Sequence, residues 1–354
     1  MEQVRNGMKT FGQKFEESGC RSAGFDYMRF ALATLIILFH SLETSYGALP
    51  VAQAHESLLR PFAAALLPMF FCLSGFLVAG SLERNPKIFP FAALRVLRIF
   101  PALALEVILS AVLLGLLFTK LPLRDYLTHG DFAAYFLNIT GYIHYTLPGV
   151  FQSNPVPDFV NAQLWTVPWE LYCYLLLIVM YRFGMLKRER WAYIVAPIIF
   201  FQFYFDFLGV NIRPFCVPGL SLIVCFVLGV LFYQYRARIP FRLDLFCFSF
   251  VLMVACLKFP GTLEIIAPLF VCYACLYLGL CNPKRDRVVL SGDYSYGLFL
   301  YGYAVQQAVA ALGPAFHHWY INFLVAFPCA LLFAAVSWWA VERPILGLRK
   351  YIIR

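Results

Sequence analysis

Apolar runs of about 20 residues recur along the whole chain, and this pattern most constrains its fold. About 20 consecutive apolar residues are what one helix needs to cross the core of a bilayer. Only 13% of the 354 residues are charged and 62% are hydrophobic, whereas a soluble domain needs about a quarter of its residues charged. The sequence therefore predicts an all-α, polytopic membrane protein, and it excludes a soluble enzyme, a disordered chain and a coiled coil.

Ten such runs predict about ten transmembrane helices. Their approximate bounds are 26–46, 62–82, 99–119, 163–182, 191–208, 217–235, 244–259, 263–280, 294–313 and 319–341. Only Pro260 and Gly261 separate the seventh and eighth runs cleanly, so either of these two could instead be a tilted or re-entrant piece. The first run follows a polar, basic segment and is long enough to span, so we expect it to stay in the membrane.

The basic residues predict the orientation of the chain. Of the 28 Lys and Arg, 23 fall on the side of both termini under the ten-run scheme. The other side holds five: Arg60, Lys120, Arg124, Arg213 and Lys258. By the positive-inside rule, both termini are expected to be cytoplasmic. Because the basic residues are scattered in short groups between apolar runs, they indicate topology and give no support for nucleic-acid binding.

The same scheme predicts the domain organisation. Residues 1–24 form a cytoplasmic N-terminal tail, 25–342 the membrane domain and 343–354 a cytoplasmic C-terminal tail. The outward segment 120–162 is long enough to form a structured lid or a binding surface. We expect an external partner to be recognised there.

Ionisable side chains inside a span are costly, so each is a candidate for function, with a structural ion pair as the competing interpretation. Arg29 and His40 lie eleven residues apart in the first run, which places them about 20° apart on one helix face and roughly 16 Å apart along the axis. His40 is the best general base in the chain because a neutral imidazole takes up a proton near neutral pH. A snorkelling Arg29 and a core His40 are the alternative.

A second group lies at the cytoplasmic end of the third run. Arg95 and Arg98 are three residues apart, so their guanidinium groups project to one side of a helix and can grip phosphate oxygens. Ordinary topological charge is the alternative interpretation for an isolated pair. Because Arg29 enters at the same membrane level, we predict an anion site for a phosphorylated cytoplasmic cofactor.

A third group opens the fourth run from outside. Glu170 has no basic neighbour in sequence, so it must be protonated or find a partner on another helix, and His40 is the expected partner. Trp165, Trp169 and Tyr172 suit the aromatic belt of a membrane interface, and the same rings can stack on a sugar. In the ninth run, Gln306 and Gln307 are expected to hydrogen-bond to other helices.

Taken together, these residues resemble the membrane acyltransferase 3 family, the multi-span acyltransferases of bacterial glycan O-acetylation. The resemblance extends from Asp26 to about Arg349. Its elements in chain order are Arg29 and His40; residues 70–77 (FFCLSGFL); Arg95 and Arg98; Leu164-Trp165-Thr166 with Glu170; residues 295–301 (SYGLFLY); and Glu342-Arg343-Pro344.

The resemblance implies a ten-helix enzyme of the bacterial inner membrane that transfers an acyl group, usually acetyl, from cytoplasmic acyl-CoA to a hydroxyl of a surface or lipid-linked glycan. His40 would be the catalytic histidine, Glu170 would belong to the outer part of the site, and Arg29, Arg95 and Arg98 would handle acetyl-CoA. No metal is expected. A covalent acyl-histidine remains open beside direct transfer. The alternatives are a transporter or flippase of lipid-linked saccharide and a sensor or assembly subunit without turnover.

Overall fold

The computed structural model describes residues 9–47, 58–186, 219–258, 265–284, 286 and 292–352. Within these residues every named element is a helix, and β pairing is limited to three isolated bridges. This agrees with the predicted all-α class. The chain divides into two compact units, which interleave along the sequence.

Unit 1 comprises Met1–Leu32, Glu56–Lys87 and Tyr172–Ser291. Its helices are α1 (Phe11–Glu17), the first part of α2 (Ala23–Tyr46), α4 (Arg60–Arg84), most of α9 (Thr166–Arg182), α11 (Gly219–Gln234), α12 (Leu243–Lys258) and α13 (Ala267–Gly279). Helix α4 packs on α11, α12 and α13. A Cβ at Gly75 would meet the carbonyl oxygen of Phe226, and a Cβ at Gly229 would meet that of Cys72. Two glycines thus let the backbones of α4 and α11 approach closely, as small residues do in membrane helices.

The predicted N-terminal tail contains helix α1, which belongs to the core of unit 1. Thr10 and Gln13 form a capping box that starts this helix. The rings of Phe11 and Phe15 are buried, and Phe11 contacts the ring of Tyr273 at a centroid distance of 5.2 Å. The two phenylalanines lie four positions apart, so both face the same side of α1 and fix it to the unit.

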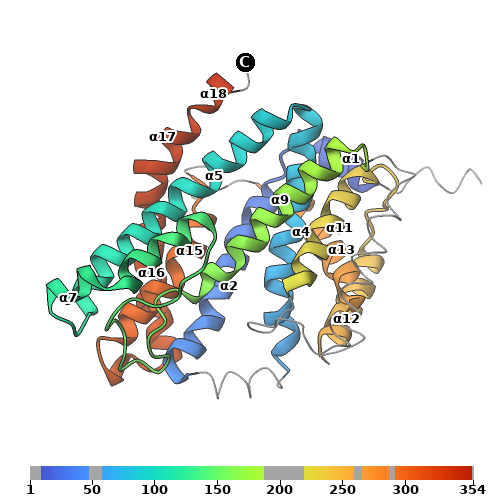
Figure 1. The fold of residues 1–354 in the computed structure, drawn as a ribbon. Helices are drawn as coiled ribbons and strands as arrows, with labels where there is room; N and C mark the ends of the chain where they lie inside the picture. The colour runs from blue at the N-terminus through green and yellow to red at the C-terminus, as the bar shows by residue number, and fades with distance from the viewer. Residues whose placement is uncertain are drawn as a thin grey trace, which may run out of the picture. The chain divides into compact units, whose positions relative to one another are not determined.

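Unit 2 comprises Ala33–His55, Ile88–Leu171 and Gly292–Arg354. It holds the second part of α2, the start of α9 and the following helices: α5 (Ile88–Ile108), η2 (Leu109–Leu114), α6 (Gly115–Phe118), α7 (Leu123–Thr128), α8 (Gly130–Tyr135), η3 (Phe136–Thr140), η4 (Ala162–Trp165), α15 (Ser295–Ala310), η7 (Pro314–Phe316), α16 (Trp319–Ser337), η8 (Trp338–Glu342), α17 (Arg343–Leu346) and α18 (Arg349–Ile352). Helix α15 packs on α16, α5 and η4, and Figure 1 labels α5, α15 and α16.

The segment 120–162, which the sequence predicts to face outward, is an ordered cap on unit 2. Tyr126 donates a hydrogen bond to the Ala111 carbonyl at 2.6 Å, and it can do so because Gly115 has no Cβ in its way. Burial raises the pKa of Tyr126 to about 12, so this hydroxyl remains a neutral donor. Gln307 donates to the carbonyls of Val156 and Phe159 at 2.9 and 2.6 Å. Helices α5–α6 and α15 therefore hold the cap in place.

Five helical segments among the described residues are long and apolar enough to cross a membrane: Ala23–Tyr46, Arg60–Arg84, Ile88–Phe118, Ala162–Arg182 and Trp319–Ile352. Helices α11 and α13 are shorter and also apolar. Nine of the ten predicted runs coincide with these and the remaining helices α12 and α15, and the run 191–208 lies outside the described residues. The chain is therefore a multi-pass membrane protein, and the count of ten spans stays a prediction.

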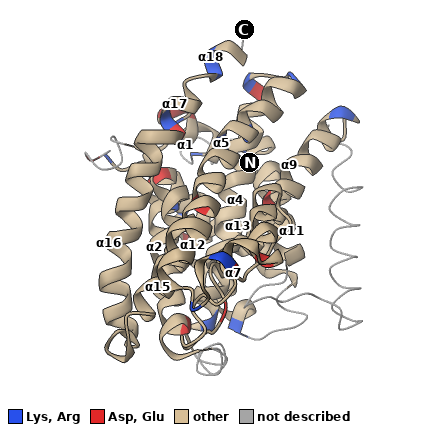
Figure 2. Ribbon diagram, turned by 60° about the vertical axis from the view of Figure 1, so that its left-hand side comes forward, with Lys and Arg blue, Asp and Glu red and all other residues tan. Residues whose placement is uncertain are grey.

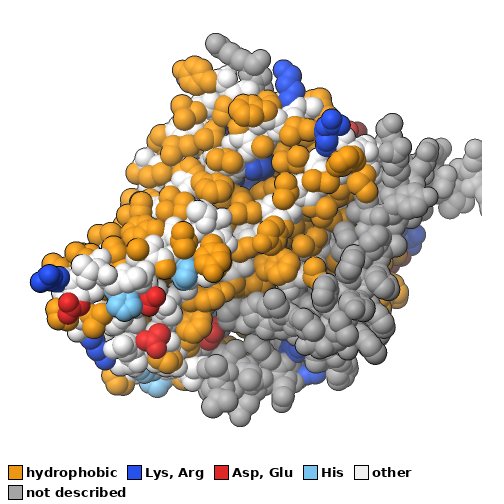
Figure 3. All heavy atoms as spheres, in the orientation of Figure 1, with side chains coloured by type: hydrophobic (Ala, Val, Ile, Leu, Met, Phe, Trp, Pro, Cys, Tyr) orange, Lys and Arg blue, Asp and Glu red, His pale blue; other side chains and the backbone are white. Residues whose placement is uncertain are grey.

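The surface of unit 2 fits a bilayer. Large apolar side chains are exposed along α5, η2 and α6, and Leu117 is 66% exposed. In Figure 3 hydrophobic side chains cover this face, and charged and histidine side chains gather around α7. Figure 2 shows basic side chains at α7 and at α17 and α18. An apolar band that ends in charged segments is what lipid contact requires.

Candidate active site

The catalytic histidine expected from the sequence is held by a carboxylate one turn along its own helix. The Nδ1 atom of His40 lies 3.2 Å from Oε2 of Glu43. The two side chains are only 18% and 12% exposed. Three residues apart on α2, they lie on neighbouring positions of one helix face. A carboxylate that accepts from Nδ1–H leaves Nε2 as the unprotonated, basic nitrogen.

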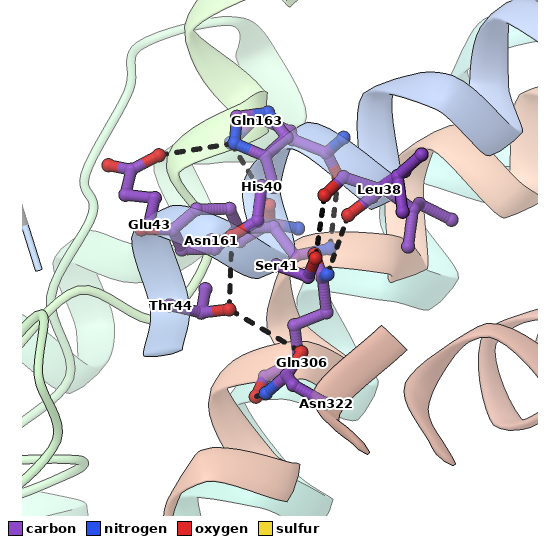
Figure 4. Close-up of polar contacts among 11 residues, drawn as sticks. Leu38, His40, Ser41, Glu43, Thr44, Asn161, Gln163, Gln306 and Asn322 are labelled. Atoms are coloured by element: carbon purple, nitrogen blue, oxygen red, sulfur yellow. Dashed lines mark hydrogen bonds and ion pairs between the residues drawn. The ribbon is translucent and has the colours of Figure 1, made fainter. Parts of the chain in front are cut away.

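The segment of α2 that carries His40 is fixed by helices α15 and α16. The Nε2 atom of Gln306 donates to the carbonyl of Ile37 at 2.7 Å, and Asn322 of α16 donates to the carbonyl of Gln306 at 3.0 Å. Thr44 donates to the His40 carbonyl at 3.0 Å. Figure 4 shows these contacts on both sides of His40. Gln306 therefore makes the interhelical bond predicted for it, whereas Gln307 donates to carbonyls of the loop before η4 and to no other helix in these bonds.

The chain that leads into α9 adds a buried polar network to the same unit. Asn161 donates its Nδ2 to the Oε1 atom of Glu106 and to the carbonyl of Leu300, each at 2.8 Å. Ser110 donates to the same Glu106 oxygen at 2.7 Å. Glu106 and Asn161 are fully buried. These bonds tie the end of the cap to α5 and α15, which fixes where η4 begins.

Gln163 and Tyr303 extend this network to His40. The backbone N–H of Tyr303 donates to Oε1 of Gln163 at 3.0 Å. The Tyr303 and His40 rings meet edge to face, with centroids 5.2 Å apart and planes at 85°. Tyr303 is fully buried, so its ring restricts the rotation of the imidazole. His40 thus has a carboxylate on one side and an aromatic wall on another.

Arg98 forms ion pairs with acidic side chains of unit 2. Its Nη2 lies 2.7 Å from Oδ2 of Asp293 and its Nη1 3.6 Å from Oε2 of Glu342. Its guanidinium also lies over the ring of Tyr296, 5.5 Å from the centroid. Ser337 donates to Glu342 at 3.0 Å. Two carboxylates beside one guanidinium reduce the positive charge that Arg98 can offer to an anion.

Arg95 and Arg29 occupy different surroundings. Arg95 lies over the ring of Phe91, 5.7 Å from its centroid. Arg29 belongs to unit 1, where its Nη2 pairs with Asp26 at 2.6 Å. Arg29 and His40 do lie on one continuous helix, α2, as predicted. A shared anion site of the three arginines stays a prediction.

The residues predicted around Glu170 lie along η4 and α9. Trp165 is buried, Trp169 and Glu170 are half-buried, and Tyr172 is 55% exposed. The carboxylate recorded at His40 Nδ1 is that of Glu43, so pairing of His40 with Glu170 stays a prediction. No group of three or more His, Cys, Asp or Glu side chains is placed to hold a metal ion within the described ranges.

The sequence reasoning missed several residues of this site. Glu43 carried a usable signal, because His40-x-x-Glu43 is the spacing that brings two side chains together on a helix. Glu106 also carried one, as a carboxylate inside the third apolar run. Their partners Asn161, Gln163 and Tyr303 come from distant parts of the chain, and no local pattern identifies them.

Comparisons with known proteins find relatives that cover nearly the whole chain. An O-acetyl transferase of Shigella phage Sf6 is 24% identical over 345 residues, covering 92% of this chain and 96% of the relative. Nodulation protein 10 of Rhizobium leguminosarum bv. viciae is 26% identical over 372 aligned positions, covering 97% and 98%. No solved structure matches the chain. A family model described as an acyltransferase domain matches residues 22–343. The chain therefore belongs to this acyltransferase family and is an acyltransferase enzyme.

Proposed function

We propose that this protein is an integral membrane O-acetyltransferase that moves an acetyl group from acetyl-CoA to a hydroxyl of a surface or lipid-linked glycan. The family model and the Shigella phage relative named O-acetyl transferase support acyl transfer to oxygen. The single observation that carries the proposal is the His40–Glu43 pair, set among hydrogen bonds that fix it within an apolar unit. We propose the inner membrane of a bacterium as its location, with both termini in the cytoplasm.

The pair performs the reaction as follows. His40 Nε2 takes the proton from the acceptor hydroxyl as the hydroxyl oxygen attacks the thioester carbon. The carbonyl π electrons move to the carbonyl oxygen, which gives a tetrahedral oxyanion. When the C=O bond re-forms, the C–S bond breaks, and the CoA thiolate takes the proton from the imidazolium. Glu43 stabilises the imidazolium because its carboxylate faces Nδ1 at 3.2 Å.

The acceptor is proposed to enter from the side of the outer cap. Asn154 of the cap donates to the Gln307 carbonyl at 2.8 Å, and Asn161 at the end of the cap reaches Glu106. The cap is therefore bonded to the helices that surround His40. Trp165, Trp169 and Tyr172 are proposed to flank the sugar, and Glu170 to belong to the outer part of the site.

Arg95 and Arg98 of unit 2 are proposed to hold the donor through its phosphates, and Arg29 of unit 1 is retained as a candidate donor-binding residue by itself. We expect Arg95→Ala to raise the KM for acetyl-CoA about tenfold and to weaken its dependence on salt, because one phosphate contact worth roughly 1–2 kcal/mol would be lost. Arg98→Ala is the matched variant. Because Arg98 neutralises buried Glu342, its loss should lower the amount of folded protein as well.

KM values for acetyl-CoA at two salt concentrations check this prediction, with protein levels measured in the same membranes. An Arg95→Ala enzyme with unchanged KM and unchanged salt dependence would show that Arg95 contributes to membrane topology and does not bind the donor.

Incubation of the purified protein with labelled acetyl-CoA and candidate bacterial glycans tests the proposed function. The proposal predicts that free CoA is released only when an acceptor glycan is present and that the label appears on a glycan oxygen. Movement of unmodified lipid-linked saccharide across vesicles, without release of CoA, would favour a flippase instead.

A further inference from the structure

Two hydrogen-bond donors beside His40 are buried and have no hydrogen-bond partner among the described residues. They are the hydroxyl of Tyr303 and the Nε2 amide of Gln163. Tyr303 is 0% exposed and Gln163 is 1% exposed. Folded proteins rarely leave such groups unsatisfied, because the donors lose their hydrogen bonds to water and gain nothing in return. Two unsatisfied donors in the same part of the site indicate that a bound ligand supplies the hydrogen-bond acceptor for them.

The two donors are fixed relative to each other. The Oε1 atom of Gln163 accepts the backbone N–H of Tyr303 at 3.0 Å, so the amide is anchored at one end and its Nε2 is left for another group. The Tyr303 ring is locked edge to face against His40. Glu43 lies close enough to the Tyr303 hydroxyl to act on it through its charge and as a hydrogen-bond acceptor, but no bond of normal hydrogen-bond geometry joins the two side chains.

Gly302 explains how these donors come so close to the histidine. A Cβ at this position would lie 2.7 Å from Cγ1 of Ile37 and 3.4 Å from Oε1 of Gln163. Ile37 precedes His40 by three residues, or about one turn of α2. Without a side chain at Gly302, α15 approaches α2 at this level and places Tyr303 against the imidazole, and Gln163 of η4 is held beside it by the Tyr303 N–H.

We propose that the Tyr303 hydroxyl and Gln163 Nε2 form the oxyanion-binding site of this enzyme and bind the carbonyl oxygen of the acyl thioester. This inference rests on the proposed acyl transfer. A carbonyl oxygen has two lone pairs and can accept from two donors. As the acceptor oxygen attacks, the π electrons move onto that oxygen, and fixed donors in a water-poor site stabilise the charge without reorganising. Collapse returns the electrons to the C=O bond and expels the thiolate.

Two substitutions remove one donor each and keep the surrounding contacts. Tyr303→Phe deletes the hydroxyl and keeps the ring against His40. Gln163→Glu keeps an oxygen that accepts the Tyr303 N–H and replaces the donating amide. Tyr301→Phe is the matched control, because Tyr301 also has a buried hydroxyl without a hydrogen-bond partner in the described chain, and its ring packs on Phe333, 5.9 Å away.

Infrared spectroscopy of bound acetyl-CoA, labelled with carbon-13 at the carbonyl, tests the assignment without turnover in a His40→Ala background. The carbonyl stretch should lie at lower frequency in the bound donor than in solution. Tyr303→Phe and Gln163→Glu should each move it back toward the solution value, and Tyr301→Phe should leave it unchanged. In the His40 enzyme, each donor variant should lower kcat about 10²-fold with the KM for acetyl-CoA nearly constant.

Unchanged carbonyl frequencies in both donor variants, with acetyl-CoA still bound, would overturn the inference. So would an increase in acceptor KM with kcat unchanged, which would place the donors on the glycan. If Gln163→Glu fails to accumulate in membranes, Tyr303→Phe alone decides. These outcomes leave the proposed function intact as long as the His40 enzyme transfers acetyl and His40→Ala does not. Absence of transfer by the unmodified enzyme would instead remove the proposed function.

Discussion

Replacement of His40 by alanine is expected to abolish acetyl transfer, with a loss of at least about 10⁴-fold in kcat. General-base catalysis alone contributes about 10²–10⁴-fold, and His40 also returns the proton to the departing thiolate. The imidazole lies within a fixed network in which α15 and α16 bond to α2 on either side of it. Glu43 and Tyr303 orient the imidazole. A water molecule in its place would not be oriented in this way and would be a poor substitute as the base.

Acceptor-dependent release of CoA measures this loss, and two controls separate chemistry from folding. The amount of His40→Ala protein in the membrane and its affinity for acetyl-CoA should match those of the unmodified enzyme. His317→Ala provides a matched histidine variant in unit 2, because His317 contacts the carbonyl of Ala310 at the end of α15. Its transfer rate should stay within a few-fold. If the His40→Ala enzyme still transfers acetyl at the rate of the unmodified enzyme, His40 takes no part in the chemical step.

The second large effect is expected from Glu43→Gln, at about 10³-fold in kcat with little change in either KM. The carboxylate of Glu43 faces Nδ1 of His40 at 3.2 Å, so it selects the tautomer with a basic Nε2 and stabilises the imidazolium. A glutamine can donate its amide to Nδ1 instead. This favours the opposite tautomer, the effect that makes an Asp-to-Asn change so costly in serine protease triads.

Steady-state kinetics in both substrates test the Glu43 prediction. Formate added to a Glu43→Ala enzyme should restore part of kcat, because a small carboxylate can occupy the vacated position. A purely structural role for Glu43 gives no such rescue. Glu170→Gln should be measured in parallel, since Glu170 was the partner expected from the sequence. If Glu170→Gln abolishes transfer and Glu43→Gln does not, the charge partner of His40 has been misassigned.

The fold could be read from the sequence to a large extent because membrane helices leave a strong local signal. Runs of apolar residues matched helices such as α4 and α16, and the alignment of Arg29 with His40 needed only the helical repeat. The backbone must satisfy its own hydrogen bonds in lipid, so an apolar run of this length has few alternatives to a helix. Helix ends and the π-helical segment η2 gave no comparable signal.

The site could be predicted only where its residues share an element. His40 was identified because a histidine in an apolar run is unusual, and Glu43 lies within one turn of it. The contact between Arg98 and Asp293 joins residues 195 positions apart, and that between Glu106 and Asn161 joins residues 55 apart. Such pairs follow from how helices pack, which a single sequence does not encode locally. For the same reason, the acidic neighbours of Arg98, Asp293 and Glu342, could not be identified from the sequence.

Affinity labelling with bromoacetyl-CoA tests most directly whether His40 is the group at the reacting carbonyl. This analogue places an alkylating carbon beside the thioester, where the nucleophilic nitrogen of the base should displace bromide and become covalently modified. Mass spectrometry of peptides from the labelled enzyme should find the added group on His40, and excess acetyl-CoA should suppress that modification. Acetyl-CoA-protected labelling of another residue, with His40 unmodified, would contradict the assignment of His40 as the catalytic base.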